Sequence, residues 1–197
     1  MSSDIVVTIT PEGADVPRNR RQEETFRKVL HAGREMLRET SYADLTVRAV
    51  AARAKVAPAT AYTYFSSKNH LIAEVYLDLI RQAPFFTDVN DSRLDRVQQA
   101  LRSLALVIAD EPEVAVACTT AVLSNDAGVP RVRDRIGAEI HKRIKSALGP
   151  DADPQIVSAL EMTYYGALVH AGSGTLTYHQ VADRMAYVVG LILREES

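Results

Sequence analysis

A chain of 197 residues fits one domain, or a small domain joined to a larger one, since domains usually hold roughly 100–200 residues. Hydrophobic residues make up 47% of the chain and charged residues 24%, which excludes a mainly disordered or collagen-like protein. No stretch approaches the roughly 20 apolar residues of a membrane span, and the first residues carry acids where a signal peptide carries bases. We therefore expect a cytoplasmic protein with no membrane partner.

The net charge of −2 hides an asymmetry along the chain. Residues 1–16 carry three acids and no base, and residues 17–68 carry eleven bases and five acids. Residues 69–197 carry twelve bases and seventeen acids. A compact basic segment on an acidic body is typical of a protein that binds a polyanion with one part and another partner with the rest. A solvated charged face fits the same pattern, so charge alone does not decide.

Helical periodicity accounts for nearly all of the chain after residue 20. Apolar residues spaced i, i+3, i+4 and i+7 predict the helices, and capping hydroxyls, Pro and Gly set their ends. The predicted helices span 21–39, 46–54, 58–65, 68–82, 93–110, 112 to about 125–128, 129–148, 154–171 and 178–195. Because no strand is predicted, the expected fold class is all-α with about nine helices.

The segment 46–65 is the most informative part of the chain. Two short helices joined by a turn of three to four residues form a helix-turn-helix. The side chains expected to pack inward are Val47, Val50, Ala51, Val56, Ala61 and Phe65. The residues left outward or at the margins suit phosphate hydrogen bonds and contacts with thymine methyl groups, and they are Pro58, Ala59, Thr60, Tyr62, Thr63 and Tyr64. Lys68, at the start of the next helix, is placed to reach a phosphate.

These residues resemble the TetR family of transcriptional regulators over about residues 21–70. The matching elements are the basic first helix, Tyr42, Thr46-Val-Arg-x-Val-Ala, Val56, Thr60-x-Tyr62-x-Tyr64-Phe65 and Lys68. The resemblance implies an all-α homodimer that binds double-stranded operator DNA with a head (21–70) and a small effector with a larger body (71–197). Residues 1–20 are then a flexible N-terminal arm. It implies phosphate or base contacts at Thr46, Arg48, Pro58, Ala59, Thr60, Tyr62, Thr63, Tyr64 and Lys68.

The segment departs from the family's pattern at four positions. Lys55 stands where Gly is usual, and a positive φ there costs Lys on the order of 1 kcal/mol relative to Gly. Ala57 stands where Ser or Thr often caps the second helix, a loss of about 1 kcal/mol. Ala59 and Ala61 replace the usual Gly and Leu. We expect these departures to alter the operator sequence rather than the motif.

The body contains an almost uncharged stretch around Cys118. Small side chains with a few polar tips can line a mostly apolar cavity or form ordinary core. The residues that would line such a cavity are Leu104, Ile108, Cys118, Val122, Met162, Tyr165 and His170. An apolar or amphipathic effector, lipid-like or an acyl-CoA, fits that lining, with Tyr165 or His170 as its hydrogen-bond partner. His170 also fits a core histidine, and Phe85 and Phe86 either close the cavity or anchor the linker.

In this interpretation the last two predicted helices form the dimer interface, as a four-helix bundle around a two-fold axis. Each carries an apolar stripe, and the stripes are Ile156, Leu160, Tyr164 and Leu168, then Val181, Met185, Val188 and Ile192. The alternative is that both stripes face the core of their own subunit.

Motifs for catalysis and metal binding are missing from the sequence. No two histidines have the i, i+3 or i, i+4 spacing of metal ligands, and no nucleophile elbow or dinucleotide fingerprint occurs. We therefore predict no metal, no cofactor and no enzymatic activity. The leading hypothesis is a repressor released from its operator by a small apolar effector. The alternatives are a regulator without an inducer, and a helical enzyme or lipid carrier whose basic head steers anionic substrates.

Overall fold

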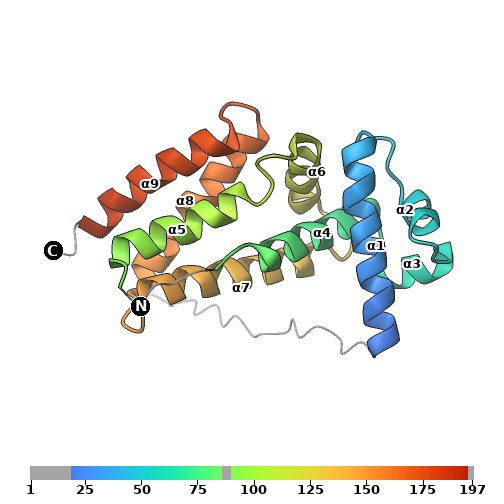
Figure 1. Cartoon of the computed structure of the whole chain (residues 1–197), viewed down its shortest axis with the longest axis horizontal. Coiled ribbons are helices and arrows are strands. Elements are labelled where there is room, and N and C mark those ends of the chain that lie inside the picture. The colour runs from blue at the N-terminus through green and yellow to red at the C-terminus, as the bar shows by residue number, and fades with distance from the viewer. Residues whose placement is uncertain (1–18, 86–89, 195–197) are drawn as a thin grey trace, which may run out of the picture.

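The computed structural model describes residues 19–85 and 90–194. Within these residues it contains nine α-helices and no strand, so the all-α prediction is confirmed (Figure 1). The helices are α1 (Arg20–Glu39), α2 (Val47–Arg53), α3 (Pro58–Tyr64), α4 (Lys68–Gln82), α5 (Arg93–Leu106), α6 (Pro112–Leu123), α7 (Val129–Leu148), α8 (Pro154–Gly172) and α9 (Tyr178–Arg194). The predicted N-terminal arm lies outside the described residues except for its last two positions, and Phe86 also lies outside them.

The helix starts follow the predicted capping residues. The hydroxyl of Thr46 accepts a hydrogen bond from the backbone N–H of Ala49, at 3.1 Å, and begins α2. Ser67 accepts from the N–H of His70, at 3.0 Å, and begins α4. Pro58 occupies the first position of α3, where its missing N–H has no cost.

Two helices end earlier than the periodicity predicts. After α5, residues 107–110 form a turn in which the N–H of Ala109 donates to the carbonyl of Leu106, because the chain must leave helical geometry before Pro112. After α6, the hydroxyl of Ser124 accepts from the N–H of Asp126, at 3.0 Å, and replaces a helical hydrogen bond. The sequence signals for both helix ends are therefore local polar and proline residues rather than the end of an apolar stripe.

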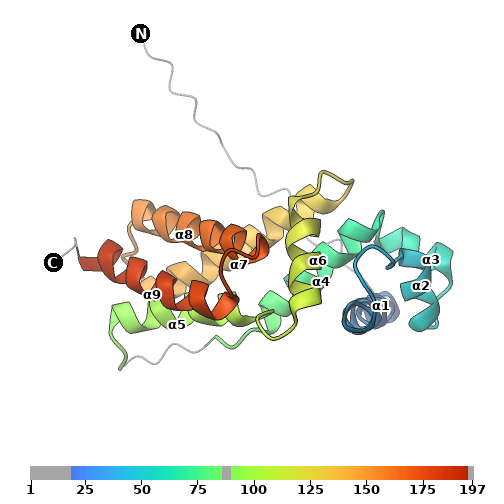
Figure 2. The same ribbon diagram turned by 90° about the horizontal axis from the view of Figure 1, so that it is seen from above.

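The helices are arranged along the long axis of the molecule. Helices α1–α3 form one end, here called the head, and α5 and α7–α9 lie together at the other end (Figure 1). Helix α4 runs from the head into this group, and α6 stands across the molecule between the head and the other helices (Figures 1 and 2). We call α5–α9 the body. No helix in the described ranges is long and apolar enough to cross a membrane.

The head has its own apolar interior, built as the helix-turn-helix pattern predicts. Every inward residue predicted for α2 and α3 is buried, apart from Val56, which is half-buried against the core. The ring of Phe65 stacks on that of Phe26 in α1, with 5.0 Å between centroids. This contact fixes α3 against α1 and leaves the opposite side of α3 at the surface.

Half of the residues in the two predicted dimer stripes face the core of their own subunit, so the stripes are wrong at these four positions. Leu160, Tyr164, Val181 and Met185 are buried in their own subunit, where α8 and α9 pack on each other and on α5. The remaining stripe residues on these helices are half-buried. Helix α8 is apolar on more than one side, so periodicity alone selects no face. The large apolar side chains that α8 and α9 leave exposed are Met162, Tyr165, Val169, Tyr187 and Leu191.

Candidate nucleic-acid interface

The turn between α2 and α3 has the geometry that the sequence predicts for it. Lys55 adopts a φ of 55°, the left-handed region that favours glycine. The N–H of Val56 donates to the carbonyl of Ala51, at 2.9 Å, and closes the turn. Ala57 supplies no side-chain cap to α3. The departures from the family's pattern at Lys55 and Ala57 therefore cost stability in the turn but do not change its shape.

The nine predicted DNA-contact residues come together at the head, on α2, α3 and the first turn of α4. Seven of them are exposed, namely Thr46, Arg48, Pro58, Ala59, Thr60, Tyr62 and Thr63. The ring of Tyr62 is 52% exposed, so it is accessible to a partner molecule. The hydroxyl of Thr63 donates to the carbonyl of Thr60, at 2.7 Å, so its oxygen remains available as an acceptor.

Tyr64 and Lys68 are half-buried and have structural contacts of their own. The ring of Tyr64 meets the ring of Phe26 edge-on, with 6.0 Å between centroids. The ammonium of Lys68 donates to the carbonyls of Tyr42, at 2.8 Å, and Ala43, at 3.3 Å, and stands 4.2 Å from the centre of the Tyr42 ring. Lys68 therefore holds the loop before α2, and only part of its hydrogen-bonding capacity is left for another partner.

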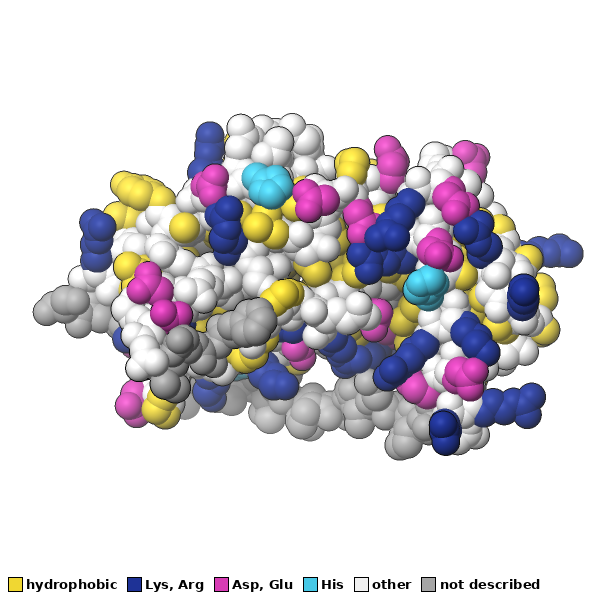
Figure 3. All heavy atoms as spheres, viewed as in Figure 1, with side chains coloured by type: hydrophobic (Ala, Val, Ile, Leu, Met, Phe, Trp, Pro, Cys, Tyr) yellow, Lys and Arg dark blue, Asp and Glu magenta, His cyan; other side chains and the backbone are white. Residues whose placement is uncertain are grey.

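Basic side chains gather over the head, as the dark blue atoms at the right of Figure 3 show. Several are neutralised within the head. Arg53 bonds both carboxylate oxygens of Glu39, at 2.7 and 2.8 Å, and this hydrogen bonding lowers the pKa of Glu39. Within residues 19–85 and 90–194, Arg48 and Lys55 form no ion pair. Their charges are therefore available to a polyanion.

The head is joined to the body through a carboxylate that sequence analysis missed. Glu111, just before α6, accepts from Arg34, at 2.5 Å, and from two nitrogens of Arg38, at 2.7 and 2.8 Å. Hydrogen bonds from Arg38 and Arg34 lower the pKa of Glu111 to about 2. More than 70 residues separate these partners in the chain, so no local pattern signals the contact.

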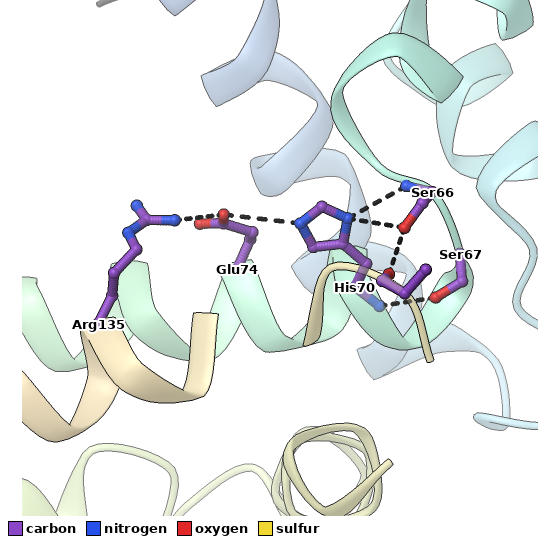
Figure 4. Close-up of polar contacts among 6 residues, drawn as sticks. Ser66, Ser67, His70, Glu74 and Arg135 are labelled. Carbon is purple, nitrogen blue, oxygen red and sulfur yellow. Dashed lines mark hydrogen bonds and ion pairs between the residues drawn. The ribbon is translucent and has the colours of Figure 1, made fainter. Parts of the chain in front are cut away.

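A second contact lies between the start of α4 and the body. The carboxylate of Glu74, which is buried, accepts from Arg135 of α7 at 2.5 Å and lies 3.9 Å from Nε2 of His70 (Figure 4). Nδ1 of His70 accepts from the backbone N–H of Ser66, at 3.1 Å. The Ser66 hydroxyl in turn donates to the carbonyl of Ala127, in the loop between α6 and α7. The residues directly after the recognition helix α3 therefore touch the body.

Within one chain, the seven predicted effector residues do not line a common cavity. Leu104, Ile108 and Cys118 are buried in the core, and burial raises the pKa of the Cys118 thiol. Val122 is half-buried. The other three predicted residues lie exposed on α8, and they are Met162, Tyr165 and His170.

Beside the buried three lies a group of hydroxyls, none of which sequence analysis assigned to the effector site. The hydroxyls of Tyr76 and Tyr164 are 3.1 Å apart, both rings are buried, and burial raises the pKa of each. Tyr178 and Thr119 lie nearby with their hydroxyl oxygens 3.5 Å apart. We call these four residues the hydroxyl cluster. It lies where α4, α6, α8 and α9 meet, in the centre of the body.

Two surface pockets lie elsewhere. One, of about 350 Å³, lies between α1 and α4 and is lined by Arg27, Leu30, His31, Arg34, Val75, Asp78, Leu79 and Gln82. The other, of about 360 Å³, lies against α5 and is lined by Pro84, Gln99, Arg102, Ser103, Leu106 and Val107. Neither contains a predicted effector residue.

An exposed second helix of a helix-turn-helix, free basic groups beside it and an attached helical body define a DNA-binding transcriptional regulator. Residues 29–75 match the family model described as bacterial regulatory proteins, tetR family. An HTH-type transcriptional regulator of Mycobacterium tuberculosis (strain ATCC 25618 / H37Rv) is 67% identical over 201 residues, which cover 98% of this chain and 94% of that protein. The chain belongs to the TetR family of bacterial transcriptional regulators.

More distant relatives share the architecture. The HTH-type transcriptional repressor KstR of Rhodococcus jostii (strain RHA1) is 27% identical over 199 residues, covering 94% of this chain and 90% of KstR. A TetR transcriptional regulator crystallised from Rhodococcus sp. RHA1 superimposes with a TM-score of 0.76 at 22% identity, covering 89% of this chain and 98% of that one. FadR of Bacillus subtilis, crystallised with stearoyl-CoA, gives a TM-score of 0.58 at 12% identity, covering 85% and 97%. The two structural likenesses establish the fold.

Proposed function

We propose that the protein is a homodimeric repressor that leaves its operator when a small, largely apolar effector enters the body. In this proposal residues 21–70, the head with the start of α4, bind DNA, and residues 71–197, the rest of α4 with the body, hold the effector and the partner subunit. The observation that carries the proposal is the exposed recognition helix α3 with Tyr62 at its surface, and the unpaired Arg48 on the neighbouring helix α2. The repressor KstR, a relative over nearly its whole length, supports repression rather than activation.

The dimer is proposed to form through the exposed apolar side chains of α8 and α9. On α8, Met162, Tyr165 and Val169 follow each other at helical spacing, and α9 adds Tyr187 and Leu191. Large apolar side chains exposed together mark interaction surfaces in soluble proteins. A second copy of the chain fits this surface because operators bound by such heads have two half-sites related by a two-fold axis. This surface replaces the two stripes that the sequence favoured.

The DNA contact is tested by removing the free cation of α2. Arg48→Ala should weaken binding to every DNA sequence by about fivefold to tenfold and reduce the salt slope by about one, because one phosphate contact is lost. Thr63→Ala should instead change the preference among bases. Fluorescence anisotropy with the upstream region of the protein's own gene, at several salt concentrations, measures both.

The matched control is Arg102→Ala, which removes an exposed arginine paired with Asp183 in the body at 2.6 Å. It should leave the affinity and the salt slope within twofold of the unmodified protein. Equal behaviour of Arg48→Ala and Arg102→Ala contradicts the assignment of the interface to α2 and α3.

The effector is proposed to bind at the hydroxyl cluster. The walls around it are apolar and include Leu104, Ile108 and Cys118, and its buried hydroxyls offer hydrogen bonds to one polar group. Such a site fits a lipid-like molecule with a single polar end, because the cluster offers neutral hydroxyls between apolar walls. The buried base near it, Arg143, already donates to the carbonyls of Ile80 and Ala83. FadR, crystallised with stearoyl-CoA, shows that a protein of this fold binds a long acyl chain.

Removing single hydroxyls tests this site. Tyr178→Phe should raise the concentration of stearoyl-CoA or of a sterol needed for half-release of DNA by about fivefold, because a buried hydrogen bond is worth about 1 kcal/mol. DNA affinity without effector should not change. Tyr165→Phe, at the exposed position favoured by the sequence, is the control and should release DNA as the unmodified protein does.

Thermal unfolding gives a second measurement. If neither stearoyl-CoA nor a sterol changes the melting temperature of the protein, the proposed effector is wrong. The protein is then a regulator without such an inducer, as the alternative hypothesis holds. A larger effect of Tyr165→Phe than of Tyr178→Phe would place the site on the α8 surface.

A further inference from the structure

The loop between α6 and α7, residues 124–128, is built as a rigid unit. The hydroxyl of Ser124 accepts from the N–H of Asp126, and the N–H of Val129 donates to the carbonyl of Asp126 at 3.1 Å. Arg133 of α7 donates to the carbonyls of Val122, at 2.9 Å, and Ser124, at 2.7 Å. The backbone of this loop is therefore fixed by hydrogen bonds within the loop and by hydrogen bonds from α7.

This loop holds Asn69, at the start of α4. The amide nitrogen of Asn69 donates to the hydroxyl of Ser124 and to a carboxylate oxygen of Asp126, each at 3.0 Å. The amide oxygen accepts from the hydroxyl of Tyr42, in the loop before α2. Lys68 donates to the carbonyl of the same Tyr42. A continuous set of hydrogen bonds thus runs from the body to the segment that leads into α2.

The same loop also holds the segment that leaves α3. The hydroxyl of Ser66, two residues beyond the end of α3, donates to the carbonyl of Ala127. Gly128 lies so close to His70 that a Cβ atom there would be 2.5 Å from Nδ1 of the ring, and its φ of 90° also favours glycine. Nδ1 of His70 accepts from the N–H of Ser66 (Figure 4). The ring of His70 therefore contacts both the segment after α3 and the loop at Gly128.

We infer that the α6–α7 loop positions the helix-turn-helix for DNA binding, with Asp126 as the main positioning residue. The loop contacts the segment after α3 directly, and it contacts the segment before α2 through Asn69. These two links fix the orientation of the two helices relative to the body. In a dimer that orientation sets the separation of the two recognition helices, and a head that samples several orientations binds with the fraction of time spent in the competent one. This inference rests on the DNA-binding function of the family.

Replacing Asp126 allows a test in which positioning and electrostatics predict opposite changes in operator affinity. Hydrogen bonds from Ser67 and Ser124 keep the pKa of its carboxyl below the ordinary range, so it carries a negative charge at neutral pH. Removing a negative charge from a protein that binds a polyanion strengthens binding if charge alone acts. Positioning predicts that Asp126→Ala weakens operator binding, by about threefold to tenfold, because the Asn69 amide loses an acceptor.

The conservative variant and a distant control complete the experiment. Asp126→Asn keeps an oxygen for the Asn69 amide, so we expect an affinity equal to or above that of the unmodified protein. Asp183→Ala removes an exposed carboxylate of α9, paired with Arg102, and should not weaken binding. In Asp126→Ala, hydrogen exchange should become faster over residues 41–46 and 64–70 and stay unchanged in α8. Anisotropy with the full-length protein and one operator fragment measures the affinities.

The inference is overturned if Asp126→Ala binds as tightly as Asp183→Ala, or if Asp126→Asn loses as much affinity as Asp126→Ala. Asn69→Ala provides a second route from the head side if Asp126→Ala does not fold. If Asp126 positions the head through its hydrogen bond with Asn69, the double variant Asp126→Ala/Asn69→Ala should lose no more operator affinity than either single variant. Additive losses contradict it.

Discussion

Replacing Tyr187 with Glu should leave the protein monomeric at micromolar concentration and lower operator affinity by about 100-fold or more. The ring of Tyr187 is 70% exposed at the proposed dimer surface of α9, so the change does not disturb the core of the single chain. In a dimer it would bury a carboxylate among apolar side chains, which costs several kcal/mol unless the charge is paired. Two linked heads bind two half-sites with an avidity that exceeds single-head binding by roughly 100-fold or more.

Light scattering during size-exclusion chromatography measures the mass, and anisotropy measures the affinity. Leu123→Glu is the matched control, since Leu123 is 67% exposed on α6, outside the proposed surface. It should remain dimeric and bind DNA normally. A dimeric Tyr187→Glu protein, or a monomeric Leu123→Glu protein, would show that the subunits meet elsewhere.

The head was predictable because its determinants are local. Thr46, Pro58 and Ser67 begin helices by contacts within three residues, and the inward set of α2 and α3 follows from helical spacing. The positive φ of Lys55 follows from the position of the turn. Exposure of the predicted DNA-contact residues then follows from burial of the opposite side, although their individual contacts to DNA stay predictions.

The body was less predictable because its contacts join distant parts of the chain. Glu111 meets Arg34 and Arg38 across more than 70 residues, and Tyr76 meets Tyr164 across 88. No spacing rule reaches that far. On α8 the difficulty is different, because stripes through Tyr164 and through Tyr165 are both apolar, and only the packing of α5 and α9 shows which one faces inward. The hydroxyl cluster was therefore missed, while its apolar neighbours Leu104 and Cys118 were found.

Two aromatic residues near the end of α3, Phe65 and Tyr62, allow the stability of the head and its DNA recognition to be tested separately. Phe65 is fully buried, stacks on Phe26 at 5.0 Å and lies 6.1 Å from the His70 ring. Phe65→Ala should lower the free energy of unfolding by about 3–5 kcal/mol, because a buried ring leaves a cavity and loses its transfer free energy. Since whole domains are stable by only about 5–15 kcal/mol, the head should lose its fold and its DNA binding together.

Tyr62→Ala removes a ring of nearly the same size three residues away, and its consequence should be the reverse. Because the side chain is half-exposed, the free energy of unfolding should change by about 0.5 kcal/mol or less, as for most surface substitutions. Operator affinity should nevertheless fall by about tenfold, through loss of a hydrogen bond and an apolar contact at the DNA. Urea unfolding followed by circular dichroism, beside anisotropy on the same samples, distinguishes the two. A Tyr62→Ala protein that is strongly destabilised, or a Phe65→Ala protein that keeps full stability, would mean that α3 presents its other face to the DNA.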